Sequence, residues 1–134
     1  MSMTSTSVQP SSTRGLSLPS ILLHLEGLTV FLTMVTIYIN QHYDGLTFLL
    51  LLFAPDLAIL GYKVNARVGS LIYNAVHTYA VPVLLLAARL WLAPDADWLT
   101  VIALIWMAHI GMDRTLGFGL KYPTVFKDTH FSRV

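Results

Sequence analysis

Five ionisable residues lie inside long apolar stretches of this 134-residue chain, where an unpaired charge is costly. They are Glu26, Asp56, His77, His109 and Asp113. Carboxylates and imidazoles are the side chains that most often transfer protons in enzymes, and burial tunes their pKa values for that work. These five residues are therefore the candidate catalytic groups for acid–base chemistry on an apolar substrate.

Neighbouring polar and aromatic residues could hold that substrate. Helical spacing puts Asn74 on the face of His77, and it puts Trp106 and His109 on the face of Asp113. The candidate substrate-binding residues are Tyr62, Tyr73, Asn74, Trp106, Arg114 and Lys121. Three acids, Glu26, Asp56 and Asp113, face one arginine inside the apolar segments, so at least one carboxyl must be protonated, bound to metal or in contact with water.

Three other interpretations compete with catalysis. Polar side chains on packed helices can simply link the helices together. The carboxylates and imidazoles could also bind a metal, but the Glu-x-x-His and HExxH motifs are absent, so we expect no cofactor and keep a metal ion as the less favoured alternative. Proton-coupled transport is disfavoured, because the other half of each apolar segment lacks ionisable residues.

The elements that position these groups follow from composition. The chain is 55% hydrophobic and only 11% charged, whereas a soluble domain has about a quarter charged residues. We predict an all-α membrane protein, an up-down bundle of four transmembrane helices at residues 18–39, 46–62, 69–93 and 98–120. Pro55 should kink the second helix beside Asp56. Counted from one membrane side, the acids and His77 lie about 10–12 Å deep, so they should meet in one chamber.

Basic residues set the orientation. With the N-terminus in the cytoplasm, seven of the eight Lys and Arg residues fall on the inner side and only Arg89 falls near the outer side. This bias places both termini in the cytoplasm. The net charge of +1 and the lack of a basic cluster exclude nucleic acid as a main partner. The absence of cysteine excludes disulfides and thiolate chemistry.

Two tails flank the transmembrane domain at residues 18–120. Residues 1–17 are rich in Ser and Thr and predict a flexible tail, with Ser17 capping the first helix and Pro19 in its first turn. Residues 121–134 mix aromatic and charged side chains. This cytoplasmic tail either folds over the chamber as a lid, bringing Lys121, Asp128 and His130 near the site, or anchors in the lipid headgroups.

A series of short motifs resembles a known family. They are Leu25-Glu26-Gly27, Ala54-Pro55-Asp56-Leu57, Tyr73-Asn74 with His77-Thr78-Tyr79, His109-Ile110-Gly111 with Asp113-Arg114, and Gly117 to Pro123 followed by Asp128-Thr129-His130. This series is similar to that of a family of small bacterial four-span integral-membrane proteins known only as a domain of unknown function. The resemblance implies that the chamber and tail residues belong to one pattern, which favours the lid.

From these patterns we expect a multi-pass protein of a bacterial inner membrane. Its partners would be the lipid bilayer and an apolar small molecule or lipid, which it would isomerise, cyclise or hydrolyse by acid–base chemistry. The main alternative is a non-catalytic subunit of a membrane complex, and a homo-oligomer is compatible with either function.

Overall fold

The computed structural model describes residues 17–133 of the chain, so the predicted tail at residues 1–17 lies outside it except for Ser17. The described residues form helices and loops, with one isolated antiparallel bridge between Lys121 and Thr129. The prediction of an all-α fold is confirmed. The α-helices are α1 Leu18–Asn40, α2 Gly45–Leu52, α3 Ala66–Val76, α4 Ala80–Trp91 and α5 Asp97–Thr115; the 3₁₀ helices are η1 Ala54–Lys63 and η2 His130–Arg133.

The two longest helices, α1 and α5, cross at a pair of glycines. Ser17 caps α1 as predicted, because its hydroxyl accepts a hydrogen bond from the Ser20 amide at 3.2 Å. At the crossing, a Cβ atom on Gly111 would lie 2.7 Å from the Phe31 nitrogen and 2.9 Å from the Gly27 oxygen. Only glycine allows the two backbones to come this close, as is common between membrane helices.

The second predicted helix changes its winding where it meets proline. The α-helical part ends at Leu52, and the chain continues from Ala54 as the 3₁₀ helix η1, with Pro55 in its first turn. Proline has no N–H to donate and its ring clashes with the preceding turn, which ends a regular α-helix. Asp56 therefore lies in the first turn of η1, immediately after the change.

The third predicted helix is broken, which the sequence analysis did not anticipate. In place of a continuous helix at residues 69–93, α3 ends at Val76 and α4 begins at Ala80, with a 41° bend between them. Pro82 explains the break, because it can neither donate to the Thr78 carbonyl nor fit beside it. His77 is the C-cap residue of α3 and so lies at this bend.

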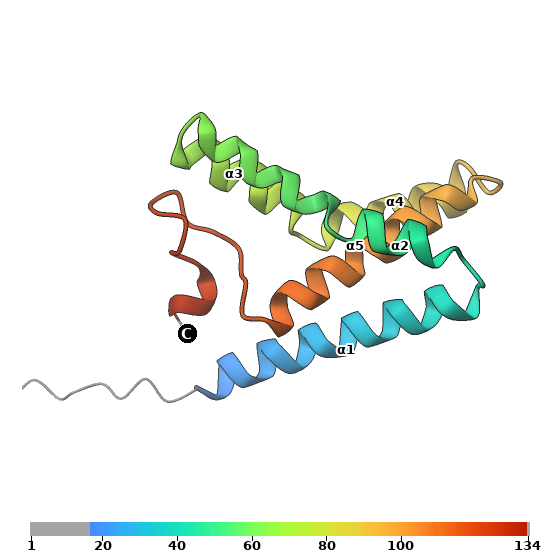
Figure 1. Cartoon of the computed structure of the whole chain (residues 1–134), viewed down its shortest axis with the longest axis horizontal. Helices are drawn as coiled ribbons and strands as arrows, with labels where there is room; N and C mark the ends of the chain where they lie inside the picture. The colour runs from blue at the N-terminus through green and yellow to red at the C-terminus, as the bar shows by residue number, and fades with distance from the viewer. Residues whose placement is uncertain (1–16, 134) are drawn as a thin grey trace, which may run out of the picture.

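The helix α5 runs through the centre of the molecule, between α1 on one side and α2 and α4 on the other (Figure 1). It contributes Leu104, Ile105, Met107 and Ala108 to a core that Tyr38 and Leu52 complete. A Schellman motif ends α5: Phe118 N–H donates to Asp113 O at 2.8 Å, Gly117 N–H donates to Arg114 O at 3.1 Å, and Gly117 has φ +84°. The chain therefore reverses direction directly after Asp113 and Arg114.

The outer surface of the helices is strongly apolar. Large hydrophobic side chains are exposed on every α-helix, among them Leu22 at 49%, Leu50 at 68%, Leu71 at 70% and Leu84 at 67%. Two helical segments, Leu18–Asn40 and Gly45–Lys63, are long and apolar enough to cross a membrane, and the bent pair α3–α4 makes a third if it is one span. These features indicate a membrane-associated protein with two to three candidate spans.

The C-terminal segment, residues 116–133, folds back beside the helices. In Figure 1 it is the red chain that lies between α3 and the first half of α1. Two pairs of atoms fix it on α3, since the Asn74 side-chain amide donates to Lys121 O at 2.8 Å and accepts from Lys121 N–H at 2.7 Å. On the α1 side, the His24 and Phe131 rings pack edge to face at 5.0 Å.

Candidate functional site

Two imidazoles and two carboxylates meet where the helices break. The Nε2 atoms of His77 and His109 lie 3.2 Å apart. Asp113 Oδ2 lies 3.5 Å from His77 Nε2 and 3.7 Å from His109 Nε2, and Asp56 Oδ1 lies 3.7 Å from each of them. All four atoms lie within 4.8 Å of one another. These four residues form the His/Asp centre.

A backbone contact fixes the proton position on His77. Its Nδ1 atom lies 2.9 Å from the Tyr73 carbonyl, which can only accept, so Nδ1 carries the proton and donates it. In the neutral ring, Nε2 then bears a lone pair aimed at the His/Asp centre. The Tyr73 ring stacks on His77 at 3.7 Å between centroids and holds its plane. This arrangement is the usual support for a metal-binding histidine.

The other two buried members are held by α5. His109 is fully buried, and its Nδ1 atom has no hydrogen-bond partner among residues 17–133. One turn further on, Asp113 accepts a hydrogen bond from the Tyr73 hydroxyl at 3.3 Å. That bond links α5 to α3 and orients the carboxylate toward the imidazoles.

Asp56 differs from the other three members in its access to the surroundings. Its side chain is 40% exposed, against 11% for Asp113, 2% for His77 and 0% for His109. The change from α-helix to 3₁₀ helix at Pro55 places it at the rim of the centre. Three buried groups thus face one more accessible carboxylate.

The spacing fits a single metal ion. Zinc bonds of 2.0–2.2 Å in a tetrahedral site put neighbouring ligand atoms about 3.3–3.6 Å apart. The three buried ligand atoms, on His77, His109 and Asp113, are separated by 3.2, 3.5 and 3.7 Å. The His/Asp centre could therefore hold a metal with little rearrangement, although the sequence lacks the local motifs that usually reveal such a site.

The structure does not bring every predicted site residue to this centre. Glu26 is exposed and lines a separate hollow of about 450 Å³ with Tyr79, Arg114 and His130. Asn74 uses its amide to hold the backbone of Lys121. The Lys121 ammonium donates to Phe126 O at 2.9 Å and lies 4.7 Å from the centre of the Tyr73 ring.

Tyr62 packs against the C-terminal segment. Its ring meets Phe126 edge to face at 5.3 Å. Its hydroxyl is buried and has no hydrogen-bond partner in the described part of the chain. Tyr62 thus lies under the same segment that Asn74 fixes, rather than in the His/Asp centre.

Trp106 and Arg114 donate hydrogen bonds to backbone carbonyls that the helix break leaves without partners. The Trp106 indole donates to Val76 O at 2.7 Å, and the Arg114 guanidinium donates to His77 O at 3.2 Å. Both carbonyls belong to the last turn of α3, where the break removes their helical partners. In an apolar environment these carbonyls need internal donors. The sequence signal for the break was Pro82, five residues after His77, which was not part of the prediction.

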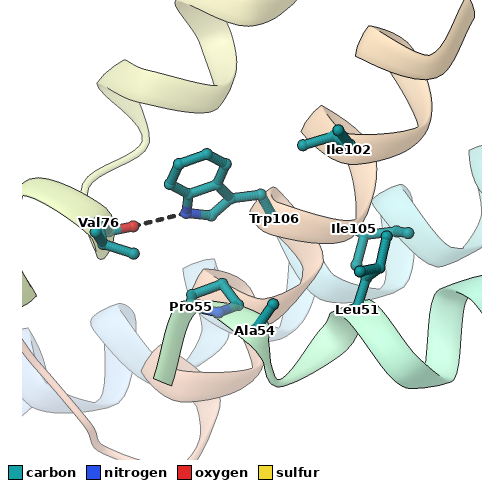
Figure 2. A pocket seen from close by; sticks show the side chains of 7 residues that line it. All are labelled: Leu51, Ala54, Pro55, Val76, Ile102, Ile105 and Trp106. Atoms are coloured by element: carbon teal, nitrogen blue, oxygen red, sulfur yellow. Dashed lines mark hydrogen bonds between the residues drawn. The ribbon is translucent and has the colours of Figure 1, made fainter. Parts of the chain in front are cut away.

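An apolar pocket of about 260 Å³ lies between residues of α2, η1, α3 and α5 (Figure 2). Three of its lining residues are close in sequence to members of the centre: Pro55 precedes Asp56, Val76 precedes His77, and Trp106 is one turn before His109. The lining residues are Leu51, Ala54, Pro55, Val76, Ile102, Ile105 and Trp106. The pocket is therefore built on the same elements as the His/Asp centre.

One protein family matches the chain. The family model described as domain of unknown function (DUF4260) matches residues 20–134, nearly the whole sequence. The chain therefore belongs to this family, and the predicted resemblance to a family known only as a domain of unknown function is confirmed. No curated protein and no solved structure matches the chain.

Proposed function

We propose that this member of the DUF4260 family is a membrane-embedded, metal-dependent enzyme that performs acid–base chemistry, with hydrolysis as the reaction class, on an apolar, lipid-like substrate. One observation carries the proposal: three buried ligand atoms, on His77, His109 and Asp113, lie at the spacing of a tetrahedral metal site. Two histidines and one carboxylate, with a further position left for water or substrate, are a common ligand set of catalytic zinc.

Zinc bound there would supply a Lewis acid that polarises a carbonyl or a water molecule. The chain's own groups would do the rest. His77 and His109 would bind the metal through Nε2, Tyr73 orients Asp113, and Asp56 accepts a proton at the rim. Asp56 suits this last role because it is the most exposed of the four side chains and lies 3.7 Å from both imidazoles.

The environment supports an apolar substrate. The lining of the adjoining pocket is apolar, and the helices around it carry the exposed hydrophobic surface of a membrane protein. We further propose that α1, α2 with η1, α3 with α4, and α5 form four spans of a bacterial inner membrane with both termini in the cytoplasm. The excess of basic residues on one side supports this orientation.

The test is hydrolysis of p-nitrophenyl octanoate by the protein purified in detergent, with and without chelation. We expect activity that is lost on chelation and restored by zinc. Asp56→Asn should keep zinc but lose most of the activity, whereas His109→Ala should lose both. If the chelated protein is as active as the zinc-loaded protein, a proton shared between the two Nε2 atoms explains the 3.2 Å contact and the metal proposal is wrong.

A further inference from the structure

We propose that the apolar pocket next to the His/Asp centre binds a single unbranched hydrocarbon chain, which enters laterally from the lipid phase. The pocket holds about nine carbons of this chain. The inference deepens the proposed function by naming the substrate class, and it rests on that function only for the group that reacts.

The side chains of the walls offer no free polar group to an occupant. The only side-chain polar group among the lining residues is the Trp106 indole N–H, and it is already bonded to the Val76 carbonyl at 2.7 Å (Figure 2). A polar group pushed into the pocket would lose its hydrogen bonds to water and gain none from these side chains. The occupant must therefore be hydrocarbon.

The mouth faces the membrane. Leu51 and Ala54 line the pocket and are also exposed on the surface, Leu51 at 38%. Both lie within Gly45–Lys63, one of the two segments that are long and apolar enough to cross a membrane. An opening in such a segment faces lipid chains and not water, so the occupant arrives from the bilayer.

The volume limits the length. A methylene group fills roughly the 30 Å³ that a water molecule takes in the liquid, so a pocket of about 260 Å³ holds about nine carbons in single file. The wall residues Pro55, Val76 and Trp106 are one residue or one turn away from Asp56, His77 and His109. A chain seated in the pocket would therefore present its functional group to the centre.

The experiment uses Trp106 as the detector. The chain has three tryptophans, and Trp91 and Trp98 are 81% and 62% exposed, so a W91F/W98F background leaves Trp106 as the only indole. The probes are ω-bromoalcohols of six to fourteen carbons, whose bromine quenches indole fluorescence on contact. We expect saturable quenching, with affinity rising about fourfold for each added methylene up to about nine carbons and levelling off beyond.

Two blocking variants and one matched control complete the design. The first blocking variant is Ala54→Phe at the mouth. The second is Ile102→Phe on the facing wall, with phenylalanine chosen over tryptophan because tryptophan would add a second indole. Ala75→Phe, on an exposed position of α3 outside the pocket, is the control. Both blocking variants should weaken quenching at least about tenfold, whereas the control should bind like the parent.

The outcomes separate the two proposals. The quenching measurement is made on metal-free and zinc-loaded protein, and the helical circular dichroism signal verifies that each variant is folded. Saturable quenching without any zinc binding would support the pocket and overturn the metalloenzyme. Zinc binding with quenching that never saturates, or that Ala54→Phe and Ile102→Phe leave unchanged, would overturn the pocket as a chain site.

Discussion

At the level of single residues, Tyr73 supports the His/Asp centre in two ways. Its carbonyl fixes the proton of His77 on Nδ1, and its hydroxyl donates to Asp113 at 3.3 Å. The first role belongs to the backbone and survives substitution, whereas the second is lost with the hydroxyl. Tyr73 is therefore a positioning residue for the proposed metal.

The variant Tyr73→Phe tests this role. We expect zinc affinity to fall about tenfold to a hundredfold, the usual effect of removing a group that orients a metal ligand. Competition with a fluorescent zinc chelator measures it. Tyr79→Phe is the matched control, because Tyr79 lines the Glu26 hollow instead of the His/Asp centre. Equal affinity of Tyr73→Phe and the parent protein would show that Asp113 needs no such support.

At the level of elements, the centre exists because two helices are interrupted. Pro55 turns α2 into η1 beside Asp56, and Pro82 separates α3 from α4 beside His77. The sequence analysis anticipated the first interruption and missed the second. Periodicity alone could not show it, because residues 69–93 remain apolar across the break, and only the backbone chemistry of proline marks its position.

The crossing of α1 and α5 gives a prediction about stability. Gly111→Ala should destabilise the protein by about 1–3 kcal/mol, because its Cβ would lie 2.7 Å from backbone atoms of α1 that cannot move aside. Gly45→Ala is the control, since a Cβ there meets nothing within 4 Å, and it should change stability by less than about 0.5 kcal/mol. Unfolding in mixed micelles of increasing SDS content measures both. Equal stability of the two variants would contradict the close crossing.

The C-terminal segment should respond to pH through His130. Its Nδ1 accepts a hydrogen bond from the Leu120 amide at 2.9 Å, and burial, together with the nearby Arg114, lowers the pKa of His130 below its ordinary 6.5. A lowered histidine pKa gives stability that is present above the unfolded value and is lost as pH falls through the folded value. The segment should therefore loosen below about pH 6.5.

Hydrogen exchange of the Leu120 amide measures this loosening. We expect its protection from exchange, corrected for the intrinsic pH dependence, to fall between pH 7 and about pH 5 in the parent protein. His130→Asn keeps a side-chain acceptor that does not titrate in this range, so its protection should change little. A parent protein with the same protection at both pH values would show that His130 does not control the segment.

At the level of the whole molecule, part of the architecture followed from the sequence. Composition predicted the all-α membrane-associated chain, and depth counting brought Glu26, Asp56, His77 and Asp113 to one level, with His109 one turn from Asp113 on the same helix face. Depth alone could not show which way Glu26 faces, and the structure gives it a separate hollow. It also could not show the 3.2 Å spacing of the imidazoles, which depends on the bend between α3 and α4.

The number of spans, and the side of the membrane on which each loop lies, remain predictions that single introduced cysteines can test. The chain contains no cysteine, so each introduced thiol is a clean probe. We expect a membrane-impermeant maleimide added outside intact cells to label Gln41→Cys and Asp95→Cys, and to label Asn65→Cys and Ser132→Cys only after the cells are opened. Labelling of Ser132→Cys from outside, with Asp95→Cys, would show that α5 does not cross the membrane.

The metal content of the purified protein tests the central claim most directly. Elemental analysis of the protein, purified without chelators, should find about one zinc ion per chain in the parent and in the Glu26→Gln control. His77→Ala and His109→Ala should hold less than about a tenth as much, because each loses one of three buried ligands. A folded parent protein that contains no transition metal and takes up neither zinc nor cobalt would contradict the account.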